Sequence, residues 1–91
     1  MNEIQCLVSG QVQGVSYRAF VEDAAKAQSL TGWVKNRPDG QVEIVAQGLT
    51  DDLKEFSEAL HRGSVLATVE NVATEWGTAE TVYEDFVIVY E

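Results

Sequence analysis

A short segment with two glycines, between an alternating strand pattern and an amphipathic helix pattern, is the strongest constraint on how this 91-residue chain folds. It reads Gly10-Gln11-Val12-Gln13-Gly14-Val15-Ser16-Tyr17-Arg18. A backbone that turns across a helix N-terminus points unpaired N–H groups at one place, where the helix dipole favours negative charge. Arg18 opposes that dipole unless an anion compensates it. The segment therefore predicts an anion-binding loop, with phosphate as the simplest guest; an ordinary glycine turn with a solvated arginine is the alternative.

The patterns on either side of this segment predict a strand and a helix. Residues 3–9 alternate between apolar and polar side chains, which is typical of a strand with one buried face. Apolar residues then recur at helical spacing to about Gln28. Ser16 is the expected N-cap, and Val15 and Phe20 would form a hydrophobic staple. Together these residues would set the direction in which the loop enters the helix.

Four further strand patterns and a second helix pattern complete the chain. The strands are expected at 33–37, 41–47, 69–76 and 85–90, and the helix at 51–62. Between the first two of these strands, Pro38 and Gly40 favour a type I turn and hence an antiparallel hairpin. In the second hairpin strand, an apolar face should oppose a polar one formed by Gln41, Glu43 and Gln47.

Thr50 should cap the second helix, with Asp51 and Asp52 in the turn where the dipole favours carboxylates.

The order of these strands and helices predicts the fold. Right-handed crossovers then place both helices on one face of an antiparallel sheet, giving an α+β, ferredoxin-like βαββαβ sandwich with one extra short strand. The first and third strands should be central and the charged second strand nearer an edge. A chain of this length allows one core, so residues 1–91 are expected to be a single domain.

Two motifs make the chain resemble the acylphosphatase family. They read Val12-Gln13-Gly14-Val15-x-Tyr17-Arg18 and, after a helix, Gly32-Trp33-Val34-Lys35-Asn36. The resemblance continues through Asp39-Gly40-x-Val42-Glu43 and a closing Phe86-x-Ile88, so it covers nearly the whole chain. It implies the ferredoxin-like fold and a hydrolase that cleaves the carboxyl–phosphate bond of small acyl phosphates. The products would be a carboxylate and inorganic phosphate, and neither a metal nor a cofactor is implied.

The resemblance also implies the site residues. Arg18 would bind the phosphate and Asn36 would orient the attacking water, with the substrate's own phosphate taking the proton. The guanidinium fork matches phosphate geometry, and an asparagine amide can both accept from and donate to a water. Without the family, Asn36 is more simply a residue of the turn that follows it. The phosphate oxygens would be held by the backbone N–H groups of Gln13, Gly14, Val15, Ser16, Tyr17 and Arg18.

Two serines depart from the family pattern. Ser16 stands where a glycine or an aromatic residue is common, which puts in doubt the rigidity of the loop and the shape of the acyl-side entrance. Ser29 replaces a glycine often found near the end of the first helix, which puts in doubt how that helix ends.

The charge distribution argues against a nucleic-acid partner. The net charge is −9, whereas affinity for a polyanion depends largely on Lys and Arg. Four of the six bases nevertheless fall between positions 18 and 37, namely Arg18, Lys26, Lys35 and Arg37. A small anion could therefore meet a locally positive site on an otherwise acidic protein.

Other conspicuous side chains have structural interpretations. Cys6 lies in an alternating strand and is expected to be a buried thiol, while Trp33 and Trp76 are expected to pack. His61 suits a surface or capping role near a helix C-terminus, and one histidine with one distant cysteine makes no metal-ligand cluster. No apolar run could cross a membrane and no signal peptide is evident, so we expect a protein of the reducing cytoplasm. We also expect it to be a monomer.

Three other functions fit parts of the sequence. An acylphosphatase-like domain could handle a carbamoyl or acyl phosphate for a larger maturation enzyme, although the chain ends where the domain does, which favours a free-standing hydrolase. An RNA-binding domain has the same order of elements, but residues 41–47 lack the aromatic and basic side chains that hold bases. A non-catalytic module that binds phosphate or another small ligand fits the fold equally well. Turnover that depends on Asn36 would exclude it.

Overall fold

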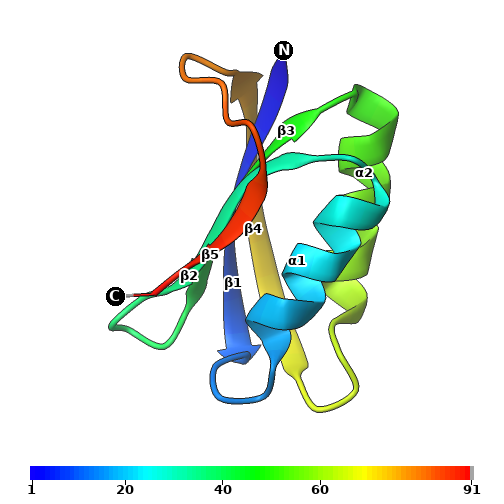
Figure 1. Cartoon of the computed structure of the whole chain (residues 1–91). Helices are drawn as coiled ribbons and strands as arrows, with labels where there is room; N and C mark the ends of the chain where they lie inside the picture. Colours follow the sequence, from blue (N-terminus) through cyan, green and yellow to red (C-terminus); the bar gives the residue numbers. More distant parts are fainter. Residues whose placement is uncertain (91) are drawn as a thin grey trace.

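The computed structural model describes residues 1–90, which form a five-stranded sheet and two helices. The strands are β1 (Asn2–Gln11), β2 (Thr31–Asn36), β3 (Val42–Gly48), β4 (Thr68–Thr78) and β5 (Phe86–Val89); the helices are α1 (Tyr17–Ala27) and α2 (Thr50–Arg62). Both helices lie on one side of the sheet (Figure 1). The ferredoxin-like order and layering are confirmed. Within residues 1–90, no helix combines the length and apolar character needed to cross a membrane.

The sheet has the strand order β4-β1-β3-β2-β5. As predicted, β1 and β3 are flanked on both sides, and they pair antiparallel with Cys6 opposite Ile44. The sheet is not wholly antiparallel, however, because β5 runs parallel to β2. After β4 the chain reverses direction and crosses to the opposite edge of the sheet. There β5 lies beside β2, so the two edge strands are β4 and β5. The charged second strand β2 lies next to the edge strand β5, so it is nearer an edge than β3, as expected, but no nearer than β1.

The core lies between the sheet and the two helices. Its buried apolar side chains come from alternate strand positions and from one face of each helix, among them Ile4, Val8, Val34, Ile44, Phe86, Val21, Ala25, Leu53, Phe56 and Leu60. Phe56 and Phe86 meet edge to face, with ring centroids 6.1 Å apart. Burial of each large apolar side chain contributes about 1.5–3 kcal/mol. Helix α1 packs over β2 and β5, which brings its N-terminus to the ends of these strands.

Two side chains differ from their expected environment. Gln47, expected on the polar face of β3, is buried: its Nε2 donates to Glu3 Oε1 at 2.9 Å and to the Thr81 carbonyl at 2.5 Å. Its Oε1 accepts from the Tyr83 N–H at 3.1 Å, so it holds the segment between β4 and β5 against the sheet. Trp76, expected to pack, is 49% exposed because it lies on the edge strand β4.

Helix α1 ends in a Schellman motif with a serine where the family pattern has glycine. The Leu30 N–H donates to the Ala25 carbonyl at 2.9 Å, and the Ser29 N–H donates to the Lys26 carbonyl at 3.1 Å. Ser29 has a φ of 57°, in the left-handed region that this motif requires. The substitution therefore preserves the usual end of the helix at some cost in backbone strain.

Helix α2 begins with its own carboxylates in the first turn. Thr50, the expected N-cap, is instead the first helical residue, and Leu49 holds the N-cap position. The Thr50 hydroxyl accepts a hydrogen bond from the Asn2 side chain, so it is tied to β1 and not to the free N–H groups of α2. Asp51 and Asp52 lie in the first turn as predicted, where carboxylates stabilise the helix.

Candidate functional site

The loop between β1 and α1 contains two residues in the left-handed region, Gly14 with φ 72° and Ser16 with φ 61°. A Cβ on Gly14 would meet no described atom within 4 Å, so glycine is favoured there by the backbone conformation and not by lack of space. Ser16 occupies the predicted N-cap position, but within residues 1–90 its side chain makes no capping hydrogen bond. Side-chain caps need an extended backbone, and Ser16 is left-handed. Such a conformation costs a non-glycine residue about 1–2 kcal/mol and is characteristic of functional sites.

The loop leaves backbone donors at the start of α1. The Phe20 N–H donates to the Ser16 carbonyl at 3.2 Å, which is the first turn of helical bonding. The N–H groups of residues 17–19 precede that bond and therefore have no acceptor inside the helix. With the helix dipole, they favour an anion at this end of α1.

Tyr17 ties the start of α1 to the end of α2. Its side chain is buried, and its hydroxyl donates to the Leu60 carbonyl at 3.0 Å. Burial raises the pKa of the Tyr17 hydroxyl far above its ordinary value, with a smaller contribution from Cys6, so the hydroxyl remains a donor. The backbone of the neighbouring Arg18 is thereby held in place.

Arg18 and Asn36 line the same pocket, which has a volume of about 310 Å³. The lining residues are Val12, Gly14, Ser16, Tyr17, Arg18, Ala19, Asn36, Ile88 and Tyr90. The structure thus brings together the two predicted side chains and the glycine loop. The pocket lining combines the polar side chains of Ser16, Arg18 and Asn36 with apolar surface from Val12, Ala19 and Ile88.

Asn36 reaches the pocket because of strand alternation. It is the last residue of β2 and pairs with Val42, so its side chain lies on the helix-covered face that Val34 also occupies. Its Oδ1 is buried and has no hydrogen-bond partner within residues 1–90. An unpartnered buried acceptor costs about 1–3 kcal/mol. Because this oxygen is shielded from solvent, a water in the pocket could relieve the cost only after a half-turn of the amide exchanges its oxygen and nitrogen.

The end of the chain contributes a wall that the sequence analysis did not assign to the site. The Arg18 guanidinium lies over the Tyr90 ring, with Cζ 4.8 Å from the ring centroid, and its Nη1 donates to the Val89 carbonyl at 3.4 Å. Ile88 and Tyr90 stand two positions apart, so they share one face of an extended segment. No sequence signal linked that face to the loop, because β5 reaches the site only through its parallel pairing with β2.

The positive region is smaller than predicted. Of the four cations between positions 18 and 37, only Arg18 lines this pocket. Lys26 and Arg37 form ion pairs with carboxylates, and Lys35 Nζ lies over the Trp33 ring, 5.5 Å from its centroid. Lys35 and Arg37 line a second cavity that also includes Asn36. An anion in the pocket of Arg18 would therefore depend on Arg18 and the loop backbone.

The remaining titratable candidates lie outside this pocket. Cys6 is buried with its Sγ 3.5 Å from Thr74 Oγ1, and burial raises the pKa of the thiol. His61 Nδ1 lies 2.9 Å from the Ser57 carbonyl, one turn earlier in α2. Within residues 1–90, no three His, Cys, Asp or Glu side chains are grouped so that they could hold a metal ion.

Comparison with known proteins identifies one family. The acylphosphatase family profile matches residues 4–88. The acylphosphatase of Marinobacter nauticus is 48% identical over 86 residues, which cover 94% of each chain. The crystal structure of acylphosphatase from Bacillus subtilis is similar with a TM-score of 0.96 and 40% identity, covering 99% of this chain and 100% of that one. The crystal structure of T. kodakarensis HypF has a TM-score of 0.87 and 30% identity, covering 98% of this chain but 12% of that longer one.

Proposed function

Because this chain belongs to the acylphosphatase family and hydrolyses acyl phosphates, we propose that its active site is the pocket that contains Arg18 and Asn36. One observation carries the proposal: both side chains line a pocket that is also lined by the left-handed Gly14 and Ser16 of the loop before α1. This combination offers a charged fork, backbone donors and a neutral amide around one small volume. This pocket suits an acyl phosphate that has a short acyl group and one or two negative charges.

The phosphate would bind at the start of α1. Its oxygens would accept from the backbone N–H groups of residues 13–18 and from the Arg18 guanidinium, whose planar fork matches two phosphate oxygens. The acyl group would then lie toward the apolar surface of Ile88 and Ala19. Phosphoryl transfer depends mostly on positioning and on stabilising charge, so these groups would supply most of the rate acceleration.

The reaction itself needs little acid or base catalysis. A water held by Asn36 attacks phosphorus opposite the acyl oxygen, the bond between phosphorus and that oxygen breaks, and the carboxylate leaves with the electron pair. The proton of the water passes to a phosphate oxygen of the substrate. The products are a carboxylate and inorganic phosphate, and the steps require neither a metal nor a cofactor.

The first test is hydrolysis of benzoyl phosphate in the presence of a chelator, with the Asn36→Ala variant for comparison. We expect chelator-insensitive turnover, with kcat lower by about 10²–10³ in Asn36→Ala and inhibition by inorganic phosphate nearly unchanged. Asn71→Ala is the matched control, because Asn71 is an exposed asparagine on β4 outside the pocket. Comparable losses of turnover and of phosphate inhibition in Asn36→Ala would contradict the water-orienting role.

We further propose that residues 1–91 act as one domain, as a monomer, in a reducing cytoplasm and without a nucleic-acid partner. The match along 94% of the Marinobacter nauticus relative supports a free-standing enzyme. The net charge of −9 disfavours a polyanionic partner, and a single buried cysteine suits a reducing compartment.

A further inference from the structure

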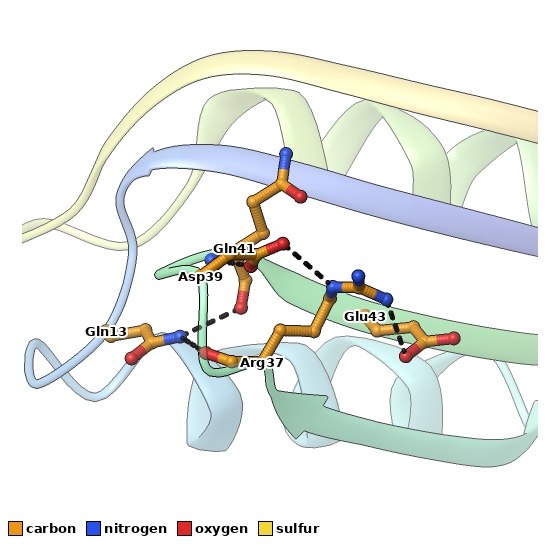
Figure 2. A network of polar contacts seen from close by, with 5 residues as sticks. All are labelled: Gln13, Arg37, Asp39, Gln41 and Glu43. Atoms are coloured by element: carbon orange, nitrogen blue, oxygen red, sulfur yellow. Dashed lines mark hydrogen bonds and ion pairs between the residues drawn. The ribbon is translucent and has the colours of Figure 1, made fainter.

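The Gln13 side chain joins the loop before α1 to the hairpin of β2 and β3 (Figure 2). Its Nε2 donates to the Arg37 carbonyl at 2.8 Å and to the Gln41 carbonyl at 2.9 Å. Both N–H bonds of the amide are thus used. One partly buried side chain makes two hydrogen bonds between segments far apart in sequence.

The two carbonyls belong to a well-braced turn. The Arg37 N–H donates to the Gln41 carbonyl at 2.8 Å, and the Gly40 N–H donates to the Arg37 carbonyl at 3.2 Å. The Asp39 carboxylate accepts from the Gln41 N–H at 3.0 Å and from Arg37 Nε at 3.2 Å; the first of these contacts chiefly holds the pKa of Asp39 below its ordinary value. Each carbonyl has a backbone donor of its own, so loss of the Gln13 amide would leave neither without a partner.

Two residues joined by this contact are sequence neighbours of residues that line the pocket. Gln13 directly precedes Gly14, and Arg37 directly follows Asn36. We propose that Gln13 is a positioning residue, which keeps the phosphate-binding loop and the water-orienting Asn36 at the separation that hydrolysis requires. The inference rests on the proposed function of this pocket.

Binding and turnover depend differently on that separation. Inorganic phosphate would contact the loop and Arg18, whereas attack of water on phosphorus requires the loop and Asn36 together. A displacement of about 1 Å between reacting groups costs on the order of 10² in rate. Loss of the Gln13 hydrogen bonds should therefore slow turnover much more than it weakens phosphate binding.

Gln13→Met tests this difference, because methionine has a similar length and no donor. We expect kcat for benzoyl phosphate to fall by about tenfold or more, while the inhibition constant of inorganic phosphate changes by less than about threefold. Gln11→Met is the matched control, since Gln11 is exposed at the end of β1 and should tolerate the change. An unchanged kcat, or equal changes in kcat and in phosphate inhibition, would overturn the inference.

A double-mutant cycle separates positioning from a general effect on folding. In an Asn36→Ala background, Gln13→Met should cause little further loss, because the separation from a missing side chain no longer matters. Losses that multiply independently would overturn the positioning role. If Gln13→Met does not fold, Gln13→Leu replaces it, since leucine also lacks a donor, adds no charge near the phosphate and should give the same split between kcat and inhibition.

The cycle also distinguishes this inference from the proposed function. If Asn36→Ala retains full turnover, the assignment of Asn36 fails and the role of Gln13 fails with it. If Asn36→Ala is impaired and Gln13→Met is fully active, only the role of Gln13 fails.

Discussion

The N-termini of α1 and α2 both have free backbone N–H groups and the positive end of a helix dipole, but the residues around them differ in charge and in backbone conformation. Helix α2 has Asp51 and Asp52 in its first turn, where they offset the positive end of the dipole. The first turn of α1 has no acidic residue and carries Arg18 in their place. The residue before α2 is extended, whereas Ser16 before α1 is left-handed. One helix start is stabilised by the chain itself, and the other is arranged so that a negative guest would stabilise it.

This difference is what distinguishes the start of α1, where we propose the phosphate site, from the start of α2. In the part of the chain that the structure describes, neither helix has a side-chain cap, but the charge rule is satisfied at α2 and broken at α1, where the N-cap backbone is also left-handed. Broken local rules concentrate at functional sites. A strained backbone and a cation near the positive end of a dipole cost stability in the absence of an anion. The proposed phosphate would offset both costs, so its affinity would depend on the strain and the charge of this helix start.

Arg18→Ala should have the largest effect, because it removes the charged fork from the functional helix start. We expect kcat/KM for benzoyl phosphate to fall by about 10²–10³, together with weaker inhibition by inorganic phosphate. Lys26→Ala, in the last turn of the same helix, is the control and should leave both quantities unchanged. If phosphate inhibition survives in Arg18→Ala, Arg18 does not bind the phosphate.

Ser16→Asp should make α1 resemble α2 and so weaken phosphate binding. A carboxylate near the loop would repel the phosphate by about 1.5–3 kcal/mol, which is about a 10- to 100-fold rise in its inhibition constant. Ser16→Asn is the matched control, because asparagine tolerates the left-handed region equally well and adds no charge. Thermal unfolding gives a second readout, since phosphate should raise the Tm of Ser16→Asn but barely that of Ser16→Asp. Equal phosphate affinity in the two variants would remove the electrostatic argument.

Removing the carboxylates at the start of α2 should have the smallest effect, and only on stability. Asp51→Asn with Asp52→Asn should lower the free energy of unfolding by about 0.5–2 kcal/mol at low salt, because each acid contributes about 0.3–1 kcal/mol to the helix. Turnover should be unchanged. The control replaces Glu55 and Glu58 with glutamine, which removes the same charge from the middle of the helix. A loss of activity on changing the Asp pair would mean that the two helix starts are not independent.

The fold was largely predictable because its signals are local. Alternation in β1 and β3, the Pro38–Gly40 turn and the apolar faces of both helices each indicate their element within a short window. The errors were non-local: Gln47 is buried by a segment that reaches it from beyond β4, and β5 pairs parallel to β2. Among residues 1–90, Ser16 holds the predicted N-cap position without a capping hydrogen bond, and Thr50 lies one residue inside its helix. Residue type suggests a cap without revealing the backbone conformation or the competing partner.

The chemical parts of the candidate site could be predicted from residue types and short spacings: a glycine loop before a helix, an arginine in its first turn and an asparagine at the end of a strand. How these parts meet depends on long-range packing. Crossover and strand pairing bring Asn36 and Tyr90 to the start of α1, and the Gln13 side chain spans two segments that only the folded sheet places together. Such contacts arise when long-range packing closes the chain, so no short window of sequence contains them.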